Sequence, residues 1–223
     1  FETYRCLGDE YPRRVRFFGL LARSRRFLGV ITHSRFAAAS FARAGFPPEK
    51  LAPFHNGYAP SDMEPLLDRK AARRATGLPQ KDFLLVYTGN MQANKGVEIL
   101  LDLAALCPRQ TFVLVGGTPA DLDRLGALAR DLKLKNVIFT GMKPVGEVPA
   151  YLHAADVLLI PPTAAPLKLY GRTVLPFKTF LYMAAARSIL GPDLPDLREV
   201  LTPRSAVLVT PDDTRAAAKA LEK

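Results

Sequence analysis

The sequence contains no tryptophan, three histidines and only two cysteines among its 223 residues. Cys6 and Cys107 are too few and too far apart to form a disulfide framework or a metal site, which fits a reducing compartment such as the cytoplasm. Long apolar runs are also missing. Leu20 and Leu21 are followed at once by arginines, so no stretch reaches the roughly eighteen apolar residues that cross a bilayer. No signal-peptide pattern opens the printed sequence.

Acidic residues are scarce in the first quarter of the chain. The whole sequence has 31 Lys and Arg against 21 Asp and Glu, a formal net charge of +10. Residues 1–60 hold ten of the basic and four of the acidic residues, so +6 of the charge lies there. This basic block, interleaved with aromatic residues, suits an anionic membrane, a phosphorylated substrate or nucleic acid, and a solvated helix face is the common alternative. No nucleic-acid-binding module is recognisable, so we expect no nucleic acid partner.

Apolar runs and amphipathic segments alternate regularly in the rest of the chain. The composition, 48% hydrophobic and 23% charged, is that of a globular protein. We expect strands over 83–87, 112–115, 137–140, 157–160, 188–190 and 206–209. We expect helices over 97–106, 120–132, 145–153 and 176–186, a helical turn near 196–201, and a last helix from 213. This order predicts an α/β domain with a Rossmann-like, doubly wound parallel sheet that binds ligands beyond the carboxyl ends of its strands.

The first part of the chain has a different organisation. Apolar residues at helical spacing with arginines between them predict a basic amphipathic helix over 14–28. A short strand at 30–32 and a helix over 35–44, capped by Ser34, follow it. We therefore expect residues 1–57 to be the end of a second domain, 58–80 to be a linker with a short helix at 68–76, and 81–223 to be the main domain.

Loops at the carboxyl edge of the sheet could bind a ligand. The loop 89–96 contains Gly89, which permits a tight turn, and Lys95 near a helix start, which favours an anion; a solvated turn lysine is the alternative. The loop 115–119 contains Gly117, beside which a planar ring could lie close to the backbone, although a tight turn explains it equally well. Met142 offers an apolar contact for such a ring.

The segment 172–183 carries the most information. Pro176 suits the first turn of a helix, which would leave the backbone N–H groups of Phe177 and Lys178 aimed at the same crevice as Lys95. Two lysines converging there could hold a diphosphate and stabilise its charge as it leaves. A core helix opened by proline is the alternative.

In order along the chain, these loops resemble glycosyltransferase family 4, whose members are retaining, sugar-nucleotide-dependent enzymes of GT-B fold. The similarity covers nearly the whole chain. The matching segments are G-N-M-Q-A-N-K-G at 89–96, F-T-G at 139–141, E-V-P-A-Y-L at 147–152, A-A-D-V at 154–157, L-P-F-K at 175–178, Y-M-A-A at 182–185 and D-L-P-D-L-R-E-V-L at 193–201, with T-H-S at 32–34 and N-G-Y at 56–58 upstream.

The resemblance implies roles for individual residues. It makes Lys95 and Lys178 the catalytic residues that stabilise the leaving diphosphate. The sequence departs from the family at four positions: Asn90 replaces an arginine of the diphosphate loop, Thr173 and Leu181 stand where the family has a pair of glutamates, and Ala186 stands where the family has a glycine. The residues expected to bind the nucleotide sugar are Gly89, Asn90, Gly117, Met142, Thr173, Phe177 and Leu181.

The resemblance also implies a function. We expect a hexosyltransferase that moves a sugar from a nucleoside diphosphate to a glycan or lipid-linked acceptor in polysaccharide biosynthesis. It would act in the cytoplasm or at the inner face of a membrane, without cofactor or metal because lysines replace a divalent ion. The acceptor site would lie in a missing N-terminal domain, so this chain alone would have little activity. The alternative is a catalytically inactive GT-B-like binding or assembly module.

Overall fold

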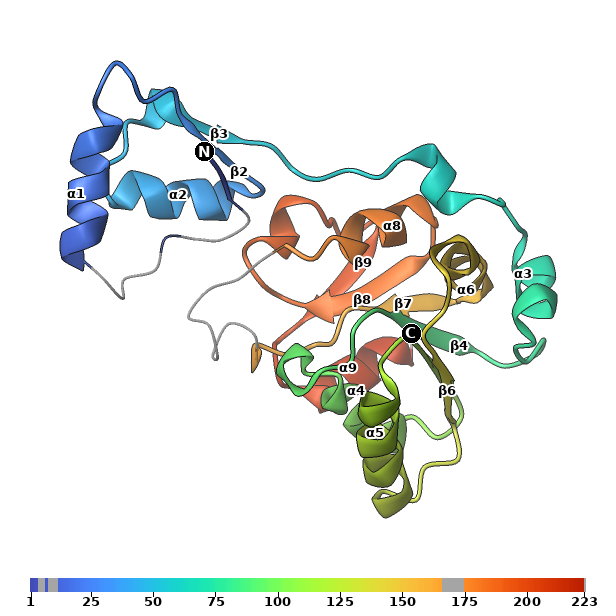
Figure 1. Cartoon of the computed structure of the whole chain (residues 1–223). Coiled ribbons are helices and arrows are strands. Elements are labelled where there is room, and N and C mark those ends of the chain that lie inside the picture. The colour runs from blue at the N-terminus through green and yellow to red at the C-terminus, as the bar shows by residue number, and fades with distance from the viewer. Residues whose placement is uncertain (4–6, 8–11, 166–174, 223) are drawn as a thin grey trace. The chain divides into compact units, whose positions relative to one another are not determined.

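The computed structural model describes residues 1–3, 7, 12–165 and 175–222 (Figure 1). The chain divides into two compact units, each with its own parallel sheet. The first comprises Phe1–Gly57, Pro166–Phe177 and Leu194–Val200. The second comprises Tyr58–Ala165, Lys178–Asp193 and Leu201–Lys223.

The second unit contains a six-stranded parallel sheet with the order β6-β5-β4-β7-β8-β9. This arrangement confirms the predicted α/β, Rossmann-like, doubly wound class, and every strand lies within two residues of its expected bounds. The strands are β4 (Leu84–Thr88), β5 (Thr111–Val115), β6 (Val137–Gly141), β7 (Val157–Leu159), β8 (Ser188–Pro192) and β9 (Ala206–Val209).

The centre of this sheet is β4. All five of its residues are buried, as a strand covered on both faces requires. It pairs with β5 on one side and with β7 on the other. The chain runs from β4 outward to β6 and then returns to the opposite side of β4, so the strand order reverses between β4 and β7. In open α/β sheets, ligands bind at the carboxyl end of such a reversal.

Two helices of the second unit, α3 (Arg69–Thr76) and α5 (Pro119–Asp131), begin where side chains cap their first backbone N–H groups. Asp68 accepts a hydrogen bond from the Ala71 amide, and Thr118 and Asp121 form a capping box. Gly77, with φ +67°, ends the first of these helices in the left-handed conformation. The α-helices are α3 (Arg69–Thr76), α4 (Glu98–Leu106), α5 (Pro119–Asp131), α6 (Val148–Ala154), α8 (Lys178–Ala184) and α9 (Thr214–Leu221), with single 3₁₀ turns η2 (Pro60–Met63), η3 (Ala93–Lys95) and η4 (Val145–Glu147).

The first unit contains a three-stranded parallel sheet, β1-β2-β3, rather than a single strand between two helices. The prediction missed β1 and β3 because each has only two or three residues and no long apolar run. The carboxylate of Glu199 accepts the backbone N–H groups of Arg35 and Phe36 at 2.7 Å each, which caps the second helix beside Ser34. The elements are β1 (Glu2–Thr3), α1 (Pro12–Ala22), β2 (Val30–Thr32), α2 (Arg35–Arg43), η1 (Pro48–Lys50), β3 (Leu51–Pro53) and η5 (Leu197–Glu199).

Three predicted helices were wrong in their bounds. Helix α1 ends at Ala22, not at residue 28, because the Lys50 ammonium binds the carbonyl oxygens of Ala22 and Ser24 at 2.9 and 2.7 Å and so closes the helix there. The helix expected over 145–153 begins as the 3₁₀ turn η4 before α6. Helix α8 begins at Lys178, so Pro176 precedes the helix and does not occupy its first turn.

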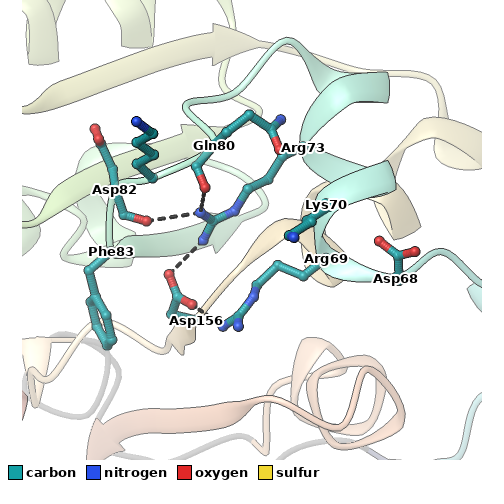
Figure 2. A pocket seen from close by; sticks show the side chains of 9 residues that line it. Asp68, Arg69, Lys70, Arg73, Gln80, Asp82, Phe83 and Asp156 are labelled. Carbon is teal, nitrogen blue, oxygen red and sulfur yellow. Dashed lines mark hydrogen bonds and ion pairs between the residues drawn. The ribbon is translucent and has the colours of Figure 1, made fainter.

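A buried guanidinium joins α3 to the amino ends of the central strands (Figure 2). Arg73 is 4% exposed and donates to the carbonyl oxygens of Ala154, Gln80 and Asp82 at 2.9–3.0 Å and to the Asp156 carboxylate at 2.6 Å. Asp156 also accepts the Leu84 amide at 2.7 Å. Because these partners belong to β4, to the residues before it and to the residues before β7, this network fixes the amino edge of the sheet.

We predict that Asp156→Ala lowers the free energy of unfolding by about 3 kcal/mol, because it leaves a buried guanidinium and the Leu84 amide without their shared acceptor. Arg69 contacts the same carboxylate but has a side chain that is 55% exposed, so Arg69→Ala should cost less than about 1 kcal/mol. Urea unfolding of both variants checks this difference. Equal stabilities would contradict the role given to Arg73 and Asp156.

Candidate functional site

The site lies at the carboxyl edge of the sheet, where the strand order reverses between β4 and β7 and the loops after these two strands begin. The two loops are in close contact, because a Cβ built on Gly96, after β4, would lie 2.4 Å from the Thr163 methyl group, after β7. Gly96 also has φ +65°, which disfavours any other residue. The two loops thus pack against each other at Gly96, a position that has no room for a larger side chain, beside the place where the strand order reverses.

The loop after β5 approaches the same place. A Cβ on Gly116 would lie 2.2 Å from the carbonyl oxygen of Gly89, and the Gly89 amide donates to Val115 at 2.9 Å. Gly117 follows, with its missing Cβ 3.0 Å from the Met91 sulfur. The two predicted glycines, Gly89 and Gly117, therefore belong to neighbouring loops at the carboxyl edge.

The loop after β7 is held by an acidic residue that sequence reasoning missed. The Asp212 carboxylate accepts hydrogen bonds from the Thr163 hydroxyl at 2.5 Å and from the Ala164 amide at 3.3 Å. The Asp212 amide in turn donates to the Pro162 carbonyl oxygen at 2.8 Å, and Asp212 has φ +66°. These contacts fix the loop that carries Thr163 toward Gly96.

Lys178, the first residue of α8, reaches the end of β4. Its ammonium lies 3.8 Å from the centroid of the Tyr87 ring and 3.0 Å from the place where a Cβ on Gly89 would be. Part of the residue is exposed, but the ammonium itself is closely surrounded by protein. Among the residues that the structure describes, Lys178 forms no ion pair with a carboxylate.

The electrostatics of Lys178 follow from this placement. Burial, and secondarily the positive charge of Lys95, lower the pKa of Lys178 from its usual 10.5 to about 7. The effect of Lys95 means that the two lysines predicted to converge are close enough to repel each other. Lys95 lies in η3 and is exposed. An anion between the two would relieve that repulsion.

Helix α8 is attached to β4 by a second tyrosine. The hydroxyl of Tyr182 accepts the Thr88 amide at 2.9 Å and lies 3.3 Å from the Thr88 hydroxyl. Burial raises the pKa of Tyr182 to about 12, so the phenol stays protonated. Because residues four apart share a helix face, this attachment directs Lys178 to the end of β4 as well.

The other predicted site residues are more exposed or lie outside the described part of the chain. Asn90 is exposed, and its carbonyl oxygen accepts the Tyr87 hydroxyl at 2.5 Å. Met142 and Phe177 are 68% and 57% exposed, and Leu181 is partly buried on α8. Thr173 lies outside the described residues. The roles given to these residues from the sequence remain predictions.

A pocket of about 510 Å³ lies at the opposite, amino end of the strands (Figure 2). Its lining includes Arg69, Arg73, Asp82 and Asp156, which form the network described above. The Arg73 guanidinium is already engaged by three carbonyl oxygens and a carboxylate. We therefore assign this pocket to the structure of the amino edge and not to ligand binding.

Neither a metal site nor a membrane span is found in the described parts of the chain. No three His, Cys, Asp or Glu side chains there come together as metal ligands. Within the same residues, every helix is too short or too polar to traverse a lipid bilayer.

The sequence resembles those of known glycosyltransferases. A family model described as glycosyl transferases group 1 matches residues 82–223. The chain is 32% identical over 133 residues to a D-inositol 3-phosphate glycosyltransferase of Catenulispora acidiphila, covering 54% of this chain and 32% of that protein. It is 26% identical over 136 residues to TuaH of Bacillus subtilis, assigned to teichuronic acid biosynthesis as a glycosyltransferase, covering 61% and 33%. The chain thus spans about a third of these curated relatives.

Solved structures agree with the family model. HepE from Anabaena in complex with UDP matches with a TM-score of 0.78 at 22% identity, over 99% of this chain and 60% of that one. At this identity the likeness establishes a shared fold, which confirms the predicted GT-B architecture. The family model covers well over half of the chain, and the chain therefore belongs to the glycosyl transferases group 1 family.

Proposed function

We propose that this chain is the nucleotide-sugar-binding part of a retaining hexosyltransferase. The observation that carries the proposal is the Lys178 ammonium, which is enclosed at the carboxyl end of β4, has no carboxylate partner among the residues that the structure describes, and is close enough to Lys95 to be repelled by it. A diphosphate supplies the negative charge that this arrangement lacks. Family membership gives the reaction class, and HepE, a neighbour of the same fold, is complexed with UDP.

In the proposed reaction, the bond between the sugar C1 and the diphosphate oxygen breaks, the acceptor hydroxyl oxygen forms the new bond to C1, and the hydroxyl proton passes to the departing diphosphate. Negative charge grows on the leaving diphosphate as this bond breaks. Lys178 and Lys95 stabilise that charge, and the dry surroundings of Lys178 strengthen its contribution. We propose a glycan or lipid-linked acceptor, bound by a further domain, and a role in polysaccharide biosynthesis in the cytoplasm, without cofactor or metal.

The alternative function is a binding or assembly module without transfer chemistry. Leu181, an apolar and partly buried residue where the family has a glutamate, favours it because leucine cannot hydrogen-bond the ribose hydroxyls. Asn90 favours it as well, because an amide replaces a fixed cation of the diphosphate loop. The alternative predicts an intact fold to which no nucleoside diphosphate binds.

Calorimetric titration with UDP, GDP and ADP tests the proposal. We expect one of them to bind, and Lys178→Ala to weaken that binding about tenfold or more, because a desolvated charge-assisted contact is lost. Lys95→Ala should weaken it about threefold, since Lys95 is exposed. Lys143→Ala is the matched control: Lys143 also faces a tyrosine ring, that of Tyr151 at 5.9 Å, and should not change the affinity. Equal binding by all variants removes the lysines from the site.

The depressed pKa of Lys178 predicts a pH dependence of binding. Above pH 7 the free protein holds an increasing share of Lys178 in the neutral form, so binding a diphosphate there must draw in a proton. We expect the affinity for UDP-glucose, or for GDP- or ADP-glucose if one of those binds instead, to fall about tenfold from pH 6 to pH 9, and net proton uptake at pH 8 in buffers of different ionisation enthalpy. Lys178→Met should abolish both effects. A flat profile in the wild type would contradict this assignment.

We further propose that α1 contacts an anionic membrane surface. Its buried face contains the small residues Gly19 and Ala22, whereas Phe17, Phe18, Leu20 and Leu21 are 49–63% exposed. Residues 11–48 contain eight arginines and no acidic residue, so the segment that includes α1 has a charge complementary to anionic lipid. A membrane carrying a lipid-linked acceptor would place that acceptor near the enzyme.

Sedimentation with liposomes tests this contact. We expect the chain to bind phosphatidylglycerol vesicles and not phosphatidylcholine vesicles, with binding that weakens as salt increases. Phe17→Ser combined with Leu20→Ser should reduce the bound fraction at least about fivefold. Leu66→Ser, which alters a residue 79% exposed in the second unit, is the matched control. Absence of binding to anionic vesicles would assign this face to a protein surface instead.

A further inference from the structure

Tyr87 contacts both parts of the candidate site. It is the fourth residue of β4, is 1% exposed, and was given no role from the sequence. Its ring lies under the Lys178 ammonium at 3.8 Å, and its hydroxyl donates to the Asn90 carbonyl oxygen at 2.5 Å. One buried side chain therefore contacts the lysine of α8 and the loop after β4.

The ring contact is much closer than the other tyrosine–lysine contact in the second unit. Lys143 lies 5.9 Å from the Tyr151 ring, at the outer limit for a cation–π interaction, and belongs to a loop at the surface. The Lys178 contact is 2.1 Å shorter and is desolvated, the setting in which such contacts are strongest. The ring occupies one side of the ammonium, whose three N–H groups leave donors for a ligand on the other side.

The surroundings of Tyr87 keep its phenol protonated and therefore neutral. Burial, followed by the neighbouring Tyr182 and the negative charges of Asp121 and Glu98, raises the pKa of Tyr87 well above its ordinary value. The phenol is therefore a neutral donor to Asn90 across the working pH range. The nearby group whose pKa is lowered toward neutral pH is Lys178, and the positive charge of Lys95 contributes to that lowering.

We propose that Tyr87 is a positioning residue for nucleotide-sugar binding: its ring holds the Lys178 ammonium at the end of β4, and its hydroxyl fixes the diphosphate loop at Asn90. A lysine side chain otherwise loses considerable rotamer entropy when a ligand immobilises it. Holding it beforehand lowers that cost and increases affinity. This inference rests on the proposed function, because it takes the bound group to be the diphosphate.

The first test needs no nucleotide. The ring current of Tyr87 should shift the ε protons of Lys178 upfield of those of the other lysines in the wild-type NMR spectrum. The signal is identified by its loss in Lys178→Arg. The shift should persist in Tyr87→Phe, which keeps the ring, and disappear in Tyr87→Leu. A Lys178 signal at the ordinary lysine position in the wild type would overturn the proposal, whatever the protein binds.

The second test is a double-mutant cycle on UDP-glucose affinity, or on GDP- or ADP-glucose affinity if one of those binds instead. Tyr87→Leu should weaken binding about tenfold in the wild type but less than about twofold in Lys178→Ala, because the ring acts through the lysine. Tyr87→Phe should weaken it less than about threefold. Equal effects of Tyr87→Leu in both backgrounds would identify a merely structural role and overturn the inference.

The two tests separate the inference from the proposed function. If no nucleotide sugar binds the wild type but the ring-current shift is present, the proposed function fails while the contact between Tyr87 and Lys178 stands. If a nucleotide sugar binds and Lys178→Ala weakens it, while Tyr87→Leu does not, the function stands and the positioning role fails. Circular dichroism melting of Tyr87→Leu and Tyr87→Phe verifies that both variants are folded before affinities are compared.

Discussion

The parallel pairing of β4 with β7 is the constraint on which the candidate site depends. Because the chain builds β5 and β6 on one side of β4 before it forms β7 on the other, the loops after β4 and β7 diverge from adjacent strand ends. Gly96 and Thr163 close the distance between these loops, and the Asp212 carboxylate holds one of them. Helix α8 then joins this edge through Tyr182 and brings Lys178 with it.

Two buried cations show how differently the two edges of the sheet use charge. At the amino edge, Arg73 has a carboxylate and three carbonyl oxygens as partners, so its charge is satisfied and stabilises the fold. At the carboxyl edge, Lys178 is partly exposed as a residue, but its ammonium is enclosed and has an aromatic ring and a second cation as neighbours. The second arrangement is costly for an isolated protein and favourable once an anion arrives, which is typical of a binding site.

The sequence predicted the sheet and its helices well because buried parallel strands are continuous apolar runs and because Ser34, Asp68, Thr118 and Asp213 each cap the start of a helix. It could not predict contacts between distant segments. Lys50 closes α1 from 28 residues away, and Tyr87 and Asp212 look in the sequence like a strand residue and a turn residue. Gly89, Gly117 and Lys95 could be placed at the carboxyl edge because they lie in loops that follow strands, and their binding roles stay predictions. Pro176 misled the prediction, since proline marks a helix start without fixing whether it lies inside or before the first turn.

The central claim is that the carboxyl edge, and not the pocket at the amino edge, binds a diphosphate through Lys178. A crystal structure of the chain with the nucleotide sugar that it binds most tightly tests this most directly. We expect a diphosphate oxygen within hydrogen-bond distance of Lys178 Nζ, with the ammonium still over the Tyr87 ring. A nucleotide bound beside Arg73 and Asp156, or a diphosphate out of reach of Lys178, would contradict it.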